Sequence, residues 1–290
     1  MISLLQQGSE IYFPNGHCEN KQLSRSTHLG IGAHPDDLEI LAIHGILDAF
    51  DDPSHFFSGI TVTNGKGAPR TSGYAEMSDE KYCKVRYQEQ KKAADIGKYN
   101  AQVFLNYESQ EIKSTMSVDL IRDLKAVITA TSPSIIYTHN PADRHDTHVA
   151  VCLHVIQAIR ELEPMPKDVK VYGCEVWRGL DWLPQDHKIS LDVSVHPDLQ
   201  CELLSVNKSQ MVENKDYIKA VEGRRIANAT FNDPYSAKHA HRIQFAMDLT
   251  PLVYHPEMMV DIFVGNSIKT FEEDVRERLD RLRRTPGAFP

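Results

Sequence analysis

The stretch "HLGIGAHPDDLEI" (28–40) decides how the first half of the chain is interpreted. Its apolar start is typical of a buried strand, and the residues after the second aspartate have the spacing of a helix. Between the two stand His34, Asp36 and Asp37, and Pro35 restricts the preceding histidine to an extended backbone. A histidine and two carboxylates at the end of a strand suit metal binding or proton transfer, although Asp at such a position also commonly caps a helix.

Strand-like and helix-like segments alternate around this stretch. Apolar, β-branched runs predict strands at 28–33, 57–63, 101–107 and 134–139, and helix-like segments lie between them at 38–50, 79–99 and 117–131. Repeated strand–helix–strand order is typical of a mostly parallel sheet with helices on both faces. The sequence therefore predicts an α/β, Rossmann-like fold for this half of the chain.

The second half continues with mixed elements. A helix is expected at 146–162, strands at 169–177, 187–193 and 241–249, a helical region at 197–227, and a charged amphipathic helix at 267–284. We predict a single domain in three parts: an N-terminal extension (1–27), a Rossmann-like core that carries the site (28–165), and a smaller C-terminal α+β elaboration packed on the same domain (166–290). The terminal helix is interpreted as packing one apolar stripe on the body, and an interface between copies of the chain is the alternative.

Composition narrows the class of protein. The 290 residues are 41% hydrophobic and 25% charged, as expected of a globular protein with a sizeable core, and the net charge is −8 with no dense basic stretch. Nucleic acid is therefore not an expected partner. No signal peptide or membrane-spanning run is recognisable, and five dispersed cysteines argue for reduced thiols, so we expect a cytoplasmic protein without a membrane partner.

A second cluster of the same residue types occurs in "THNPADRHDTHVAV" (138–151), directly after a predicted strand. Because ligands bind beyond the carboxyl ends of strands in open α/β sheets, we expect this cluster to meet the first one. Imidazole and carboxylate groups are the usual non-thiolate ligands of zinc, and a catalytic zinc site needs only three of them. The second cluster contributes five such groups: His139, Asp143, His145, Asp146 and His148.

This pair of motifs resembles the PIG-L/LmbE family of zinc-dependent N-acetylglucosaminyl deacetylases. The Ala-His-Pro-Asp-Asp signature of the family is matched by residues 33–37, and its two histidines at a helix start are matched by His145 and His148. The resemblance covers roughly residues 28–155. It is extended by an Asn-Gly turn in "TNGKG" (63–67), by Arg86 and Glu89 in an Arg-x-x-Glu helix, and by "NKSQ" (207–210).

The resemblance implies roles for individual residues. It makes zinc, or another divalent transition metal, the cofactor, and assigns the site as follows: His34, Asp37 and His148 as metal ligands, Asp36 as general base, His145 as second catalytic group, and Arg86 as a residue that holds the sugar. The family usually has Pro-Asp between its two histidines, where this chain has Asp146-Thr147. Asp143 or Asp146 is therefore expected to replace the carboxylate that supports His145.

We accordingly predict a zinc-dependent hydrolase that removes the N-acetyl group from an N-acetylglucosamine-type sugar or conjugate. Asp36 would take a proton from the attacking water, whose pKa zinc lowers, and either Asp36 or His145 would protonate the leaving amine. Trp177 and the neighbouring Arg178 are predicted to contact the substrate, with core packing as the alternative for the tryptophan. Two other functions stay open: a metal-dependent hydratase or lyase of an unsaturated carboxylic acid on the same scaffold, and a sugar-binding module without catalysis.

Overall fold

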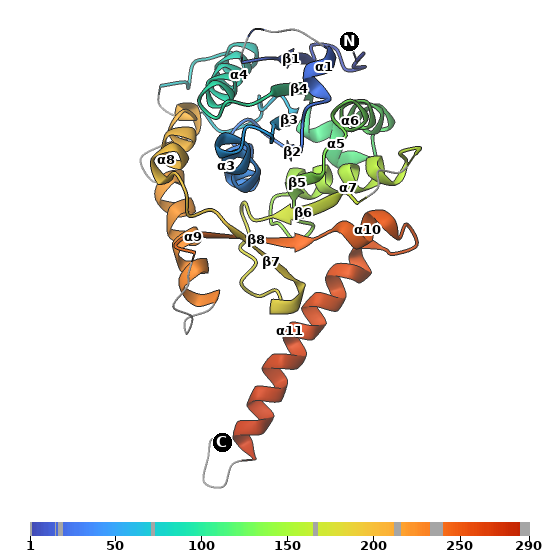
Figure 1. Ribbon diagram of the computed structural model, residues 1–290, viewed down its shortest axis with the longest axis vertical. Helices are drawn as coiled ribbons and strands as arrows, with labels where there is room; N and C mark the ends of the chain where they lie inside the picture. The colour runs from blue at the N-terminus through green and yellow to red at the C-terminus, as the bar shows by residue number, and fades with distance from the viewer. Residues whose placement is uncertain are drawn as a thin grey trace.

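The computed structural model describes residues 2–14, 16, 20–70, 73–164, 168–211, 216–232 and 240–284. Within them, eight strands form one sheet in the order β1-β4-β3-β2-β5-β6-β8-β7 (Figure 1). The strands are β1 (Glu10–Tyr12), β2 (His28–Gly32), β3 (Phe57–Thr63), β4 (Ala101–Tyr107), β5 (Ile135–His139), β6 (Lys170–Cys174), β7 (Lys188–Asp192) and β8 (Ile243–Asp248).

The centre of the sheet is parallel and its two edges are antiparallel. Strands β4, β3, β2, β5 and β6 run parallel to one another, whereas β1 pairs antiparallel with β4, and β8 pairs antiparallel with both β6 and β7. The predicted α/β fold with a mostly parallel sheet is therefore confirmed. After β2, the strands β3 and β4 are added on one side of it, and β5 and β6 are added on the other side. The strand order therefore reverses between β2 and β5.

Helices cover both faces of this sheet (Figure 1). On one face lie α5 (Ser109–Ser114), α6 (Val118–Thr131), α7 (Asp146–Arg160) and α10 (Thr250–Tyr254), and on the other lie α2 (Leu38–Leu41), α3 (Ile43–Asp51), α4 (Asp79–Ile96) and α8 (Pro197–Ser205). The remaining helices are α1 (Asn20–Leu23), α9 (Tyr217–Asn232) and α11 (Val260–Arg283). Each face has its own apolar core, because alternate side chains of a strand point to opposite sides of the sheet: Leu29 and Ile31 of β2 belong to one core, and Phe57 of β3 belongs to the other.

Most predicted elements are present, with several differences in detail. The predicted helix at 38–50 is interrupted at Ala42, where α2 ends and α3 begins. The helical region at 197–227 is two helices, α8 and α9, with a 3-10 turn at Lys208–Gln210 between them. The edge strand β1 was not predicted, because three residues are too few for a periodic pattern.

The last helix differs most from its predicted packing. Its start contacts the core through Val260, Phe263 and Val264, but every residue from Ile268 to Arg284 is exposed. Figure 1 shows α11 projecting away from the body of the molecule. The apolar stripe of this part of α11 therefore lies on the surface rather than against the body.

Two further observations bear on the sequence predictions. None of the described helices combines the length and the apolar character needed to cross a bilayer. Among the described residues, Cys83, Cys152, Cys174 and Cys201 are free thiols, and Cys18 lies outside the described residues.

Candidate active site

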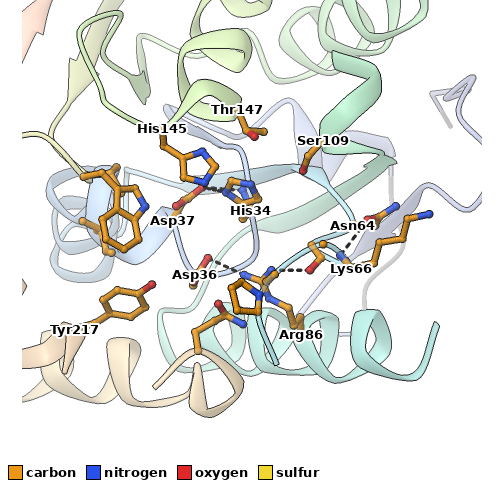
Figure 2. Close-up of a pocket in the computed structure, with 18 of the residues that line it drawn as sticks. His34, Asp36, Asp37, Asn64, Lys66, Arg86, Ser109, His145, Thr147 and Tyr217 are labelled. Carbon is orange, nitrogen blue, oxygen red and sulfur yellow. Dashed lines mark hydrogen bonds and ion pairs between the residues drawn. The ribbon is translucent and has the colours of Figure 1, made fainter. Parts of the chain in front are cut away.

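The two predicted clusters meet at the point where the strand order reverses. The 33–37 loop follows β2, and the 139–148 segment follows β5, which is the neighbour of β2 in the sheet. His139 at the end of β5 accepts a hydrogen bond at its Nε2 from the backbone N–H of Ala33, 2.9 Å away, and this bond joins the two loops directly. The loops form the floor of a pocket of about 750 Å³ (Figure 2).

Possible metal-binding atoms of three side chains, His34, Asp37 and His148, face one another beside this floor. The Nδ1 of His34 lies 3.2 Å from Asp37 Oδ2 and 3.3 Å from His148 Nε2, and that Nε2 lies 3.4 Å from Asp37 Oδ1. Around a tetrahedral zinc ion with bonds of about 2.0–2.1 Å, neighbouring donor atoms stand about 3.3–3.4 Å apart. The three side chains therefore have both the chemistry and the spacing of a site for a divalent metal.

The position of Asp37 distinguishes this site from a helix cap. Asp37 precedes α2, but its carboxylate caps none of the N–H groups of that helix. Instead, Oδ2 accepts a hydrogen bond from the backbone N–H of His34 (2.7 Å) and lies 3.4 Å from His139 Nε2. The carboxylate is thus directed at histidines, as a metal ligand requires.

The charges of these groups are set by burial and by one another. Burial lowers the pKa of His34 to about 4, against the opposing effect of Asp37. For His148 burial also lowers the pKa, but the carboxylates of Asp37 and Asp143 outweigh it and raise the pKa above its usual value. Burial raises the pKa of Asp37, yet His148 and His139 hold it well below its usual range, so this carboxylate is ionised. An ionised carboxylate beside imidazoles is a suitable ligand set for a cation.

The second cluster is organised by Asp143, and not in the way the sequence analysis expected. Asp143 Oδ1 lies 3.6 Å from His148 Nδ1 and accepts the backbone N–H of His145 (2.9 Å), and Oδ2 accepts the backbone N–H of Trp177 (3.0 Å). It therefore lies beside the Nδ1 edge of the His148 ring and connects this loop to the segment after β6. Asp146 is exposed in the first turn of α7.

The imidazole of His145 lacks the expected carboxylate partner. Within the described residues its Nδ1 is buried and makes no hydrogen bond, and the ring packs against His148 at 4.5 Å between centroids. Burial and the neighbouring His148 lower the pKa of His145. Its neutral form is thereby favoured at the edge of the pocket.

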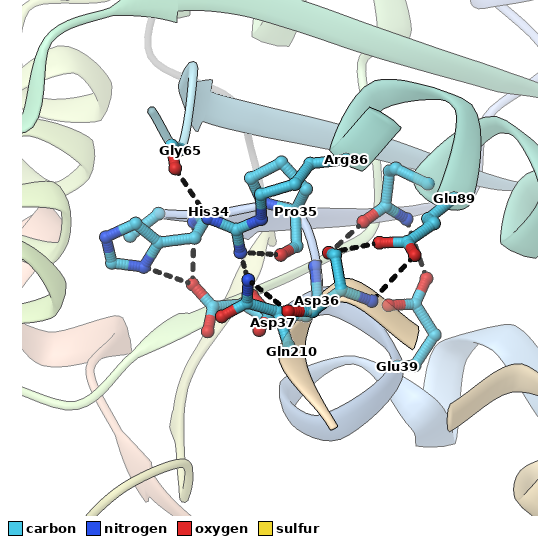
Figure 3. A network of polar contacts seen from close by, with 12 residues as sticks. His34, Pro35, Asp36, Asp37, Glu39, Gly65, Arg86, Glu89 and Gln210 are labelled. Atoms are coloured by element: carbon cyan, nitrogen blue, oxygen red, sulfur yellow. Dashed lines mark hydrogen bonds and ion pairs between the residues drawn. The ribbon is translucent and has the colours of Figure 1, made fainter. Parts of the chain in front are cut away.

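Asp36 faces a different environment from its neighbour Asp37 (Figure 3). Its backbone has a φ of 110°, and its N–H donates to Gln90 Oε1 (3.2 Å). Its Oδ1 accepts a hydrogen bond from Arg86 Nη2 (2.9 Å), and Arg86 also donates to the carbonyl oxygens of Gly65 (2.9 Å) and Pro35. The Arg86 side chain, with 2% of its surface exposed, holds the Asp36 carboxylate at the pocket floor and also lines the pocket. Its predicted contact with a sugar stays a prediction.

Further hydrogen bonds connect α4, the helix that carries Arg86, to the segment 207–210. Glu89, one turn along α4 from Arg86, accepts hydrogen bonds from the backbone N–H (2.8 Å) and the hydroxyl of Ser209. Gln210 donates to the hydroxyl of Tyr82 (2.7 Å), which is also on α4. The "NKSQ" segment (207–210) thus packs on α4, the helix that carries Arg86.

The family model described as PIG-L, GlcNAc-PI de-N-acetylase, matches residues 29–159, which include both loops of the site. This segment is a PIG-L domain. No curated protein sequence matches the chain.

Solved structures support the same fold for the PIG-L domain and its C-terminal strands. The 4-carboxy-2-hydroxymuconate hydratase of Pseudomonas putida superposes with a TM-score of 0.62 at 17% identity, over 77% of this chain and 96% of its own. The N,N'-diacetylchitobiose deacetylase of Pyrococcus horikoshii has a TM-score of 0.59 at 15% identity, over 83% of this chain and 90% of its own. The A40926 pseudoaglycone deacetylase has a TM-score of 0.56 at 15% identity, over 77% of this chain and 97% of its own. At these identities the likeness is one of fold.

Segments outside the PIG-L domain also line the pocket. Trp177, which follows β6, lines the pocket, as the sequence analysis predicted, and Tyr217 of α9 stands beside it with ring centroids 6.0 Å apart. Burial, together with Asp36 and Asp37, raises the pKa of Tyr217, so its hydroxyl keeps a proton to donate. Arg178, the other predicted residue of this segment, is exposed and absent from the lining of the cavity.

Sequence reasoning missed the cationic side chains around the pocket. They are Lys66, Lys113, Arg144 and Arg224. Lys66 pairs with Glu108, and Arg224 donates to the carbonyl oxygen of Val176 (2.6 Å). Lys66 belongs to the quoted Asn-Gly turn and Arg144 to the quoted stretch 138–151. Lys113 and Arg224 belong to no motif, and basic residues without one usually denote no more than a solvated surface.

A second group of possible metal ligands lies at the opposite, amino-terminal end of the central strands. It consists of His28, Asp48 and His55. Asp48 Oδ2 already lies 2.6 Å from His55 Nδ1 and 3.3 Å from His28 Nε2. None of these three residues lines the pocket.

Proposed function

We propose that this protein is a metal-dependent deacetylase that hydrolyses the acetamide of an N-acetylglucosamine-type sugar or conjugate. The observation that carries the proposal is the set of donor atoms 3.2–3.4 Å apart on His34, Asp37 and His148, with the Asp36 carboxylate beside it at the pocket floor. The match to the PIG-L family model supports it, as do the deacetylases among the solved structures of the same fold.

In this proposal His34, Asp37 and His148 hold the metal ion. Bound there, zinc would polarise the acyl carbonyl and lower the pKa of water, which are the two effects that amide hydrolysis needs at neutral pH. Asp143, behind His148, would keep the ring in the orientation that directs Nε2 at the site.

Asp36 is proposed as the general base, and Arg86 as its positioning residue. An ionised carboxylate at the pocket floor can take the proton of an attacking water, and the contact with Arg86 Nη2 keeps one oxygen fixed while favouring the ionised form. His145 is on the other side of the donor set, with an imidazole at the pocket edge (Figure 2). The proton that Asp36 takes from the water would pass to the leaving amine, either directly or through His145. Tyr217 would donate a hydrogen bond to a developing oxyanion or a sugar hydroxyl.

One observation favours a substrate that carries a negative group. The pocket is lined by four cationic side chains outside the catalytic floor, of which Arg144 lies over the Trp177 ring at 5.8 Å. Cations around an open cleft attract a phosphate or carboxylate. The same observation supports the second candidate function, hydration of an unsaturated carboxylic acid, since one solved structure of this fold is a hydratase of a carboxymuconate.

The two functions are separated by one experiment on zinc-loaded protein. We expect acetate release from a panel of N-acetylglucosamine, its 1- and 6-phosphates and its oligosaccharides, with the phosphorylated sugars preferred, and no change in absorbance when an unsaturated dicarboxylate is supplied. Asp36→Asn should lower the rate by about 100- to 10,000-fold, because the amide is not a base, while the metal content stays the same. Loss of dicarboxylate absorbance without acetate release would instead establish the hydratase, and no turnover of either class would refute both.

A further inference from the structure

The last helix of the molecule has an apolar surface that the body of the protein does not cover. From Ile268 onward all 17 residues of the segment 268–284 are exposed, which corresponds to about 25 Å of helix projecting from the body (Figure 1). Five of them are large hydrophobics with 40–50% of their surface exposed: Ile268, Phe271, Val275, Leu279 and Leu282.

These five side chains form a single stripe. Their spacings of three and four residues place them within an arc of about 80° on a helix with 3.6 residues per turn. A stripe this narrow is typical of a seam between two helices, whereas a helix that lies on a globular core usually has a broader apolar face. The polar faces of the helix are held by i,i+4 ion pairs, including Glu272 with Arg276 and Asp274 with Arg278.

Charge along the helix is polarised. Residues 261–274 contain four carboxylates and one lysine, for a net charge of −3, whereas residues 275–284 contain five arginines and two carboxylates, for a net charge of +3. Two such helices laid side by side in the same direction would place like charges together. Laid in opposite directions, the acidic half of each lies beside the basic half of the other.

We propose that α11 is a dimerisation element that pairs antiparallel with α11 of a second copy of this chain. The pairing covers the apolar stripe of both helices, matches the two charged halves, and is isologous, as expected of a twofold homodimer. It also places the two bodies at opposite ends of the helix pair. A parallel pair would bring both bodies to the same end, because each body joins its helix at the amino-terminal end.

The proposal is tested by sedimentation equilibrium of the full chain, from about 1 to 200 μM. We expect a monomer–dimer equilibrium that Leu279→Glu weakens at least about 100-fold, because a twofold pair would bury the new charge twice. The matched control is Phe231→Glu on α9, a hydrophobic residue that is 80% exposed but lies outside the stripe, which should leave the dissociation constant within about threefold.

The direction of pairing is tested by reversing charge in one half. Replacing Glu272, Glu273 and Asp274 by lysine makes both halves basic, and should weaken the dimer at least about tenfold at low salt. Replacing Arg281, Arg283 and Arg284 by glutamate in the same chain should restore it, because opposite halves again carry opposite charge. A wild-type chain that stays monomeric, or a dimer that survives Leu279→Glu, would overturn the proposal. A dimer that the first charge reversal leaves unchanged would overturn the antiparallel arrangement.

Discussion

Adjacent carboxylates in this protein have different environments because the chain turns between them. Asp36 adopts a positive φ of 110°, so its side chain and that of Asp37 leave the loop in different directions. Asp37 points at three histidines, whereas Asp36 is held by the buried guanidinium of Arg86. One loop therefore carries two carboxylates in separate environments, as the proposed metal ligand and the proposed base require.

Arg86 offers a test of that separation. Arg86→Met would remove the cation next to Asp36, so the pKa of Asp36 should rise and the acidic limb of the kcat/KM profile should move to higher pH. We expect a rate about 10- to 100-fold lower at neutral pH, from loss of positioning, and a free energy of unfolding about 3 kcal/mol lower, because a buried ion pair is broken. The control is Arg86→Lys, which keeps the charge and should shift the limb less. A lower rate with an unmoved pH profile would show that Arg86 does not act through Asp36.

The proposed metal ligands can be tested by measuring the zinc content of variants. His148→Ala removes one of the three facing donor atoms, so zinc retained after dialysis should fall, with affinity lowered at least about 100-fold. His55→Gln alters the group at the opposite end of the strands and is the matched control. We expect zinc to raise the melting temperature of wild type and His55→Gln but not of His148→Ala. If His55→Gln is the variant that loses zinc, the metal binds at the amino-terminal end of the sheet.

Single residues of the site could be predicted from the sequence where their side chains are chemically distinctive. Histidines and carboxylates at two strand ends predicted the facing donor atoms, because parallel strands end at a common edge. The role of Asp143 was misjudged, since its contact with the His148 ring rather than the His145 ring depends on loop geometry. Tyr217 could not be identified from the sequence as a residue of the pocket. It is at the start of α9, far along the chain from both motifs, and no local sequence pattern indicates that it lines a pocket.

Among the elements, the turn after β3 has the strictest geometric requirement. Gly65 has a φ of +67°, and a Cβ there would lie 2.4 Å from Arg86 Nη1 and 3.1 Å from Pro35 Cδ. The turn can accept the Arg86 hydrogen bond at the Gly65 carbonyl only because the side chain is absent.

Gly65→Ala should therefore lower the free energy of unfolding by about 1–3 kcal/mol and reduce turnover by displacing Arg86. Gly67→Ala, two residues along the same turn, meets no atom within 4 Å and should stay within about 0.5 kcal/mol of wild type. Urea denaturation and steady-state kinetics of both variants make the comparison. Equal effects of the two substitutions would show that neither the backbone conformation nor the contact with Arg86 matters.

The accuracy of the element predictions follows from burial. The central strands were located because every residue of β2 and β3 is buried, which leaves continuous apolar runs. The break between α2 and α3 was missed because Ala42 is itself a good helix former, and its non-helical backbone (φ −110°) is imposed by tertiary packing.

At the scale of the molecule, the strand order brings the site together, and the antiparallel strands at one edge extend the sheet beyond the PIG-L domain. The segment after β6 supplies Trp177, and α9 supplies Tyr217 and Arg224, so part of the pocket wall comes from residues that the family model does not match. Differences in substrate between proteins of this fold are thus expected to reside in these walls, whereas the floor is set by the parallel strands.

The exposed part of α11 should be dispensable for folding. A chain that stops after Lys269 keeps Ser267, whose hydroxyl lies 3.3 Å from His187 Nδ1, and the described residues that it loses, 270–284, are all exposed. We therefore expect its free energy of unfolding, measured at concentrations where the full chain is monomeric, to change by less than about 1 kcal/mol. Full-length Leu279→Glu, which keeps the helix, is the control and should match it. A loss of several kcal/mol on truncation alone would show that the helix packs on the body in solution, as the sequence analysis first expected, and would remove the surface on which the dimer depends.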